Sequence, residues 1–149
     1  MDGMTNADRQ EGTLSTELVH QLWLAACEAH DKAYAPYSHY RVGAAILDDS
    51  GVVHRGCNVE NAAYPQGWCA EASALSAMVA AGARRVRAVV LVGGVGSWVT
   101  PCGGCRQKLR EFAAPNTPIF SANPHALGPM HLLGDLLPHS FGPDHLDSP

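Results

Sequence analysis

The chain has 149 residues, of which 46% are hydrophobic and 16% are charged, so its composition is that of a globular domain and not of a disordered segment. Its formal net charge of −4 provides no basic field for a phosphate backbone, which argues against a nucleic-acid duplex as partner. No apolar run approaches the roughly 18 to 20 residues that span a bilayer, and the polar N-terminus is unlike a signal peptide, so we expect no membrane partner and a cytoplasmic location.

The N-terminal part of the chain predicts a leader followed by a helix. Residues 1–14 are polar and acidic, and we expect them to form a disordered leader before a single domain over residues 15–149. Ser15 can cap a helix, and apolar residues after it recur at three- and four-residue spacing. The spacing predicts a helix that fades near Tyr34, before a proline.

After this helix the sequence predicts alternating strands and helices. In chain order they are strands at 40–47 and 52–58 joined by a turn at 48–51, a loop at 61–68, a helix at 69–81, a strand at 87–92, a helix at 102–113 and a strand at 118–121. The tail beyond residue 128 mixes a short strand or helix with turns. This order predicts an α/β fold, a mixed β-sheet with helices packed on both faces in three layers.

Three cysteines fall at predicted helix starts that follow loops, namely Cys69, Cys102 and Cys105. Cysteine thiolates bind Zn²⁺ at about 2.3 Å, and a catalytic zinc keeps three protein ligands and one open position. Free N–H groups at helix N-termini can bond the sulfurs and favour the thiolate form. Cys-x-x-Cys also occurs in redox pairs and structural zinc sites, although a redox pair is typical after the first strand of a βαβ unit. We interpret Cys27 and Cys57 as small buried hydrophobic residues.

An acidic residue, Glu71, follows Cys69 by two positions. In a regular helix the two side chains would point about 200° apart, but a first residue that is not yet helical would let both approach one centre. A carboxylate beside zinc-bound water can take its proton and pass it to a leaving group. A ligand-x-Glu followed by Pro-Cys-x-x-Cys is the pattern of zinc-dependent deaminases, in which a three-cysteine variant occurs.

The chain resembles the short-form, homotetrameric cytidine deaminases from about Leu18 to Leu146. The similar segments are APYSHYRVGAAI at 35–46, GCNVENAAYPQGWCAEASAL at 56–75, PCGGCRQ at 101–107 and LLPHSFGPDHL at 136–146. The resemblance implies one Zn²⁺ per subunit, held by the three cysteines, with Glu71 as the proton carrier. It also implies hydrolysis of cytidine or deoxycytidine to uridine or deoxyuridine with release of ammonia, a reaction of pyrimidine salvage.

The resemblance further implies which residues bind the nucleoside. Asn58 and Glu60 would hydrogen-bond the ribose hydroxyls, and a carboxylate that accepts from a hydroxyl is a strong contact. Tyr40 stands where the family usually has Phe near the base, and the backbone of Ala70 would contact the pyrimidine. The residues expected to line the site, in part from neighbouring subunits of a homotetramer, are Tyr37, Tyr64 and Phe141.

One position departs from the family pattern. Ala72 stands where the family commonly has an Arg that bonds the thiolates and reduces their negative charge, and Arg106 is a substitute only by its proximity in sequence. The related blasticidin S deaminases also lack that Arg. Deamination of a modified cytosine nucleoside or a blasticidin-like antibiotic is therefore an alternative. A structural zinc or an inactive nucleoside-binding protein, with Cys57 or His54 as fourth ligand, is an alternative of another class.

Overall fold

A computed structural model of the protein describes residues 13–146, and residues 1–12 and 147–149 lie outside the described part. The predicted leader therefore lies outside it except for its last two residues. Helix α2 (Thr16–Asp31) begins as predicted, because the Ser15 hydroxyl oxygen accepts a hydrogen bond from the backbone N–H of Leu18 at 3.1 Å. Leu14, immediately before this cap, already packs against the core under α2.

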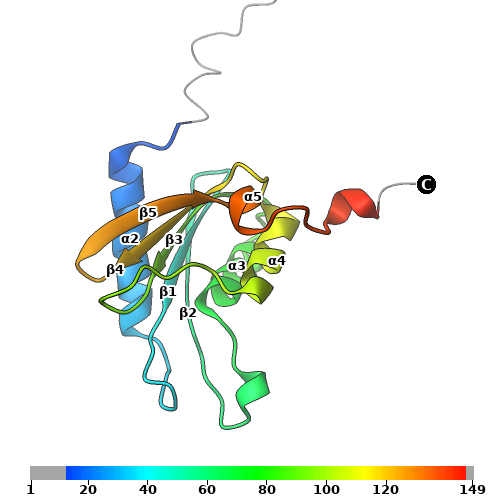
Figure 1. Ribbon diagram of the computed structural model, residues 1–149. Helices are drawn as coiled ribbons and strands as arrows, with labels where there is room; N and C mark the ends of the chain where they lie inside the picture. Colours follow the sequence, from blue (N-terminus) through cyan, green and yellow to red (C-terminus); the bar gives the residue numbers. More distant parts are fainter. Residues whose placement is uncertain (1–12, 147–149) are drawn as a thin grey trace, which may run out of the picture.

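The core of the molecule is a mixed five-stranded sheet (Figure 1). Its strands are β1 (Gly43–Asp48), β2 (Val53–Cys57), β3 (Val86–Val92), β4 (Pro118–Asn123) and β5 (Ala126–Leu132). They lie in the order β2-β1-β3-β4-β5, and β3 and β4 form the one parallel pair. The parallel pair requires a crossover, which helix α4 (Gly103–Phe112) provides.

Helices cover both faces of this sheet, which confirms the predicted three-layer fold. Figure 1 shows α2 on one face and α3 (Ala70–Ala80) with α4 on the other. Successive residues of β1 serve the two layers in turn: Ala44 and Ile46 belong to the core under α3 and α4, and Ala45 and Leu47 to the core under α2. Burial on both faces makes β1 a continuous apolar run.

The main differences from the sequence prediction lie at element ends and in the tail. The first strand begins at Gly43 and not at Tyr40, and α2 ends at Asp31. Strand β5 begins at Ala126, before the predicted tail, and tolerates Pro129 because it is an edge strand. Short helices α5 (Leu133–Leu136), η1 (Tyr64–Gln66) and η2 (Pro143–His145) complete the described chain. Within residues 13–146, no helix has the length and apolarity to cross a membrane.

Close packing fixes α3 against the sheet. A Cβ added at Gly56 of β2 would lie 2.3 Å from the backbone nitrogen of Ala74 in α3, closer than atoms can approach. Glycine at this position therefore lets the helix lie directly on the strand. The arrangement positions the start of α3, and with it the segment from Cys69 to Glu71.

Candidate metal centre and active site

The three predicted ligand cysteines converge at the N-termini of two helices. Cys69 and Cys102 are the N-cap residues of α3 and α4, both with extended backbones (ψ of 160° and 163°), and Cys105 lies in the first turn of α4. The three sulfur atoms all lie within 4.8 Å of one another, and the Cys69 and Cys102 sulfurs are 3.7 Å apart. Two sulfurs held tetrahedrally at about 2.3 Å from one ion would be about 3.8 Å apart, so this spacing suits zinc.

The chemistry of the three thiols also fits a bound cation. Burial, then the negative charge of Glu71, raises the pKa of the Cys105 thiol far above its usual range. Burial likewise raises the pKa of Cys69, whereas the pKa of Cys102 is lowered because hydrogen bonds from the Cys105 backbone and the neighbouring thiols outweigh its burial. Three crowded thiols become thiolates together only when a cation compensates them, and soft thiolate donors select zinc.

Glu71 lies in the same place because Cys69 is not helical. The extended N-cap conformation of Cys69 meets the condition under which Cys69 and Glu71 can approach one centre. The Glu71 side chain is only 4% exposed, and this burial raises its pKa, against the lowering effects of the Cys105 thiol and the Lys108 charge. A raised pKa favours the protonated form of the carboxyl group, which can then transfer its proton.

The described residues supply no fourth ligand for a closed structural site. Within residues 13–146, the group of His, Cys, Asp and Glu side chains that converges here contains the three cysteines alone. Of the two candidate fourth ligands, His54 is instead hydrogen-bonded to the Asp48 carboxylate at 2.7 Å in the β1–β2 hairpin. Cys57 is a free thiol on β2 and is not part of the group. The arrangement is that of an open, catalytic type of zinc site.

Hydrogen bonds join the segment with Asn58 and Glu60 to the start of α3. Val59 and Trp68 exchange two backbone hydrogen bonds of 3.0 Å, which places residues 58–60 beside the residue that precedes Cys69. The Trp68 indole donates to the Ser73 hydroxyl at 2.8 Å, and that hydroxyl donates to the Cys57 carbonyl at 2.9 Å. Ser73 is a site-supporting residue that sequence reasoning missed, because its role depends on contact between α3 and β2.

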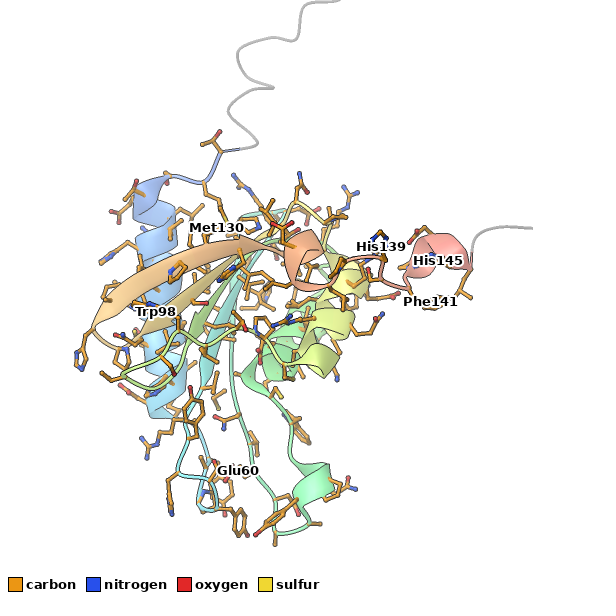
Figure 2. All side chains as sticks on the ribbon, in the orientation of Figure 1. Glu60, Trp98, Met130, His139, Phe141 and His145 are labelled. Atoms are coloured by element: carbon orange, nitrogen blue, oxygen red, sulfur yellow. The ribbon has the colours of Figure 1, made fainter. Side chains whose placement is uncertain are left out.

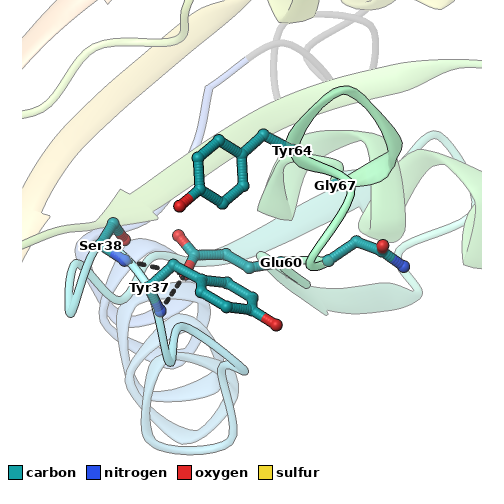
Figure 3. Close-up of a pocket in the computed structure, with 6 residues that line it drawn as sticks. Tyr37, Ser38, Glu60, Tyr64 and Gly67 are labelled. Carbon is teal, nitrogen blue, oxygen red and sulfur yellow. Dashed lines mark hydrogen bonds between the residues drawn. The ribbon is translucent and has the colours of Figure 1, made fainter.

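Glu60 lies between the two predicted tyrosines (Figure 3). Its Oε1 accepts hydrogen bonds from the backbone N–H groups of Tyr37 and Ser38 at 2.9 and 3.0 Å, and the Ser38 hydroxyl and backbone lower its pKa. The rings of Tyr37 and Tyr64 are 5.7 Å apart. These residues line a cavity of about 300 Å³ together with Asn61 and Gly67. The cavity holds a charged acceptor between two aromatic rings, and it lies outside the cysteine group.

The remaining predicted site residues lie in three places. Ala70 is fully buried as the first residue of α3, next to Cys69. Tyr40 is 41% exposed in the segment before β1. Phe141 lies on the C-terminal segment beyond α5, and Figure 2 shows it well separated from Glu60. A single chain therefore does not bring Phe141 to Glu60.

Two cationic side chains of α4 have distinct roles near the cysteines. The Arg106 guanidinium donates to the carbonyls of Pro101 and Leu136, each at 2.7 Å, and to the Thr100 hydroxyl at 3.1 Å. Arg106 thus braces the chain just before Cys102. Lys108, which sequence reasoning missed, is the cation that acts on Glu71. Its position three residues after Cys105, on the same helix face, was the available signal.

Comparisons with known proteins agree with this geometry. A family model described as the cytidine and deoxycytidylate deaminase zinc-binding region matches residues 16–121. The cytidine deaminase of Sporosarcina psychrophila is 36% identical over 128 residues, 86% of this chain and 94% of that protein. That of Mycobacterium tuberculosis is 45% identical over 121 residues, 81% of this chain and 87% of that protein.

Solved structures give the same result. The crystal structure of cytidine deaminase from Burkholderia pseudomallei superposes with a TM-score of 0.79 at 41% identity, covering 86% of this chain and all of that one. The Mycobacterium tuberculosis structure superposes with a TM-score of 0.72 at 42% identity, covering 83% of this chain and 97% of that one. With the family model matching more than half of its length, the chain belongs to the cytidine and deoxycytidylate deaminase family.

Proposed function

We propose that the protein is a zinc-dependent enzyme that hydrolyses cytidine and deoxycytidine to uridine and deoxyuridine with release of ammonia. The observation that carries the proposal is the convergence of three sulfurs within 4.8 Å, with the buried Glu71 two residues after the first ligand. One zinc ion per subunit would be held by Cys69, Cys102 and Cys105, and when bound it supplies an activated water. The thiolate ligands need a reducing compartment, which supports a cytoplasmic role in pyrimidine salvage.

Glu71 carries the proton transfers in this proposal. Burial raises its pKa, which favours the protonated form. Glu71 takes a proton from the attacking water and donates it to N3 of the pyrimidine while the water oxygen bonds to C4. It then takes the proton of the new C4 hydroxyl group and passes it to the exocyclic amine, so that the C4–N bond breaks and ammonia leaves. The backbone of Ala70, directly between Cys69 and Glu71, contacts the base and keeps its amino-bearing edge against the carboxyl group.

Asn58 and Glu60 bind the sugar, and the geometry around Glu60 supports this. Both backbone N–H bonds reach its Oε1, so the other carboxylate oxygen is the acceptor for a ribose hydroxyl. Tyr37 and Tyr64 flank this carboxylate and enclose the sugar, and Tyr40 stands against the base. A ribose-bearing substrate suits this set of groups better than a free base does.

Neighbouring subunits of a homotetramer complete the sites, with Phe141 as the shared residue. Its segment is fastened to α4, because Gln107 donates to the Phe141 carbonyl at 2.9 Å and Arg110 donates to Ser140 and Asp144. The Phe141 ring stays 57% exposed, with the His145 ring stacked on it at 5.1 Å. A rigid arm with an exposed aromatic ring is suited to insertion into a second copy of the chain.

Mixed oligomers test the shared site. Phe141→Ala and Glu71→Gln proteins, each inactive alone, should regain part of the activity after co-refolding, because a Phe141→Ala subunit keeps Glu71 and receives the ring from its neighbour. If Phe141 serves its own subunit, every site in the mixture lacks one group and no activity returns. A fully active monomer in sedimentation would also contradict the shared site.

Glu71→Gln tests the reaction itself. The amide is isosteric but cannot carry protons, so turnover of cytidine should fall by about 10²- to 10⁴-fold or more while zinc content stays unchanged. The matched control is Glu111→Gln, an exposed carboxylate of the same helix as Cys105, which should leave turnover unaltered. Unchanged turnover in Glu71→Gln would remove Glu71 from the mechanism.

A substrate panel separates the proposed function from the alternatives. Cytidine, deoxycytidine, modified cytosine nucleosides and blasticidin S can be followed by ultraviolet absorbance, with chelator controls. Cytidine and deoxycytidine should be the best substrates. Turnover of blasticidin alone would support the antibiotic deaminase, and zinc binding without turnover of any compound would support a structural or binding protein.

A further inference from the structure

Asn58 is bonded through every polar group it possesses to the segment that precedes β1. Its Oδ1 accepts from the backbone N–H of Val42 at 2.8 Å, and its Nδ2 donates to the carbonyl of Tyr40 at 2.9 Å. Its own backbone donates to the Val42 carbonyl at 3.1 Å and accepts from the Tyr34 N–H at 3.0 Å. Asn58, the residue after β2, therefore holds the chain in place both before Tyr40, at Tyr34, and after it, at Val42.

The other end of Tyr40 is also fixed. Its hydroxyl accepts a hydrogen bond of 3.4 Å from the Gly94 backbone, just past the end of β3. A Cβ added at Gly93 would lie 2.9 Å from that hydroxyl, and one added at Gly94 would lie 3.2 Å from the ring. The absence of side chains at the two glycines thus leaves space for the Tyr40 ring, while Asn58 holds the backbone of Tyr40.

These contacts give Asn58 a structural role in addition to its proposed contact with the sugar. One of the two Nδ2 hydrogens and one of the two Oδ1 lone pairs are already in use. The residue that these bonds locate, Tyr40, is 41% exposed and stands in the segment expected to face the base. The bonds join Asn58 to the backbone of residues 40–42, so their loss should loosen that backbone segment as well as the Asn58 side chain.

We propose that Asn58 is a positioning residue that places Tyr40 against the pyrimidine ring, so that its effect on the reaction extends to substrates that lack sugar hydroxyls. The inference deepens the proposed function and rests on it. Its physical basis is that a displacement of about 1 Å in a group that orients a substrate can cost about a hundredfold in rate. Removing the two side-chain bonds of Asn58 leaves the Tyr40 carbonyl and the Val42 N–H without these partners.

The decisive experiment compares cytidine with 2′,3′-dideoxycytidine in the wild type and in Asn58→Ala. If Asn58 positions Tyr40, kcat/KM falls by a similar factor, about 10- to 100-fold, on both nucleosides. If Asn58 acts only by contact with a ribose hydroxyl, the loss appears with cytidine and disappears with the dideoxynucleoside, which would overturn the proposal.

A double-variant comparison adds a second criterion. Because Asn58 acts through Tyr40, the Asn58→Ala and Tyr40→Ala losses on the dideoxynucleoside should not add: the double variant should be no slower than Tyr40→Ala alone. Additive losses would show that the two residues act independently. Asn58→Asp, which keeps the acceptor for Val42 but places an oxygen against the Tyr40 carbonyl, should show an intermediate loss and serves if the alanine variant folds poorly.

Hydrogen–deuterium exchange tests the fastening without any turnover. Residues 35–42 should exchange faster in Asn58→Ala than in the wild type. The matched control is Asn123→Ala, which removes two comparable bonds to the backbones of His125 and Ala126 in the β4–β5 turn. It should speed exchange only there and leave both substrates unaffected. Unchanged exchange at 35–42 overturns the fastening, whereas a wild type that does not deaminate cytidine overturns the proposed function and leaves the exchange result to be judged by itself.

Discussion

The brace formed by Arg106 gives the most quantitative prediction. Lys at this position can keep one of the three hydrogen bonds, to Pro101, Leu136 or Thr100, and must lose the other two. A hydrogen bond to a charged group contributes about 1.5 to 3 kcal/mol, and partial burial places these at the lower end, so Arg106→Lys should cost about 3 kcal/mol of unfolding free energy. With a urea dependence of about 2 kcal/mol per M, the midpoint of unfolding should fall by about 1 to 2 M.

The brace should also affect the metal. Because Pro101 precedes Cys102, loosening its carbonyl should let the two α4 sulfurs move, and we expect zinc release to a colorimetric chelator to quicken about tenfold. The control is Arg84→Lys, since Arg84 donates to the carbonyls of Val79 and Ala83 at an exposed position. That change should cost less than about 1 kcal/mol and leave zinc release unaltered. Equal, small shifts for both variants would refute the reasoning.

Three further predictions concern packing, acid stability and charge. Gly56→Ala and Gly43→Ala should each lose about 1 to 3 kcal/mol or more in urea unfolding, because a Cβ would come within 2.3 Å of α3 and 2.1 Å of α2 respectively. Unchanged unfolding midpoints would contradict this close packing. Burial raises the pKa of Asp48, but hydrogen bonds from His54 and neighbouring groups outweigh it and lower the pKa to about 2. Ionised Asp48 therefore stabilises the fold by about 2 kcal/mol above pH 4, and this stabilisation is lost as the pH falls from about 4 to 2. Asp48→Asn should flatten the pH dependence of the unfolding free energy in this range, and an unchanged dependence would count against the contribution of the Asp48–His54 pair. Ala72→Arg should raise turnover and alter zinc affinity by adding positive charge beside the sulfurs, and identical kinetics and affinity would show that the charge argument is wrong.

Local sequence signals predicted most of the fold. The Ser15 cap, the predicted helix at 69–81 and the predicted helix at 102–113 agree with the structure to within a residue or two at their starts, because capping and loop signals are local. The start of β1 could not be placed, because residues 42–47 are uniformly apolar and Asn58, sixteen positions away, holds Val42 outside the strand. Strand β5 begins before the predicted tail and contains Gly128 and Pro129, which weaken the strand pattern in the sequence. Such residues are tolerated in an edge strand, and the edge position is known only from the fold.

The candidate site was predictable where spacing alone determines geometry. Cys102 and Cys105 share one helix turn, and the extended backbone of Cys69 lets Glu71 turn toward the same centre. The contacts of Ser73 could not be predicted, because they depend on how α3 lies on β2. The hydrogen bonds of Asn58 could not be predicted for the same reason, because its partners are known only when the chain has folded back on itself.

Because position 72 carries no Arg, other groups must compensate the negative charge of the three thiolates. Three thiolates around a divalent cation carry a net charge of −1, and the carboxyl group of Glu71 is buried beside them. Arg106 does not compensate by contact, since its hydrogen bonds go to two carbonyls and a hydroxyl, and Lys108 acts on Glu71. The stabilisation that remains comes from the positive ends of the α3 and α4 dipoles, because Cys69 and Cys102 are the N-cap residues of these two helices. Because backbone groups depend on the position of whole helices, the packing of α3 and the brace on α4 should matter more for zinc binding here than in a relative that carries the Arg.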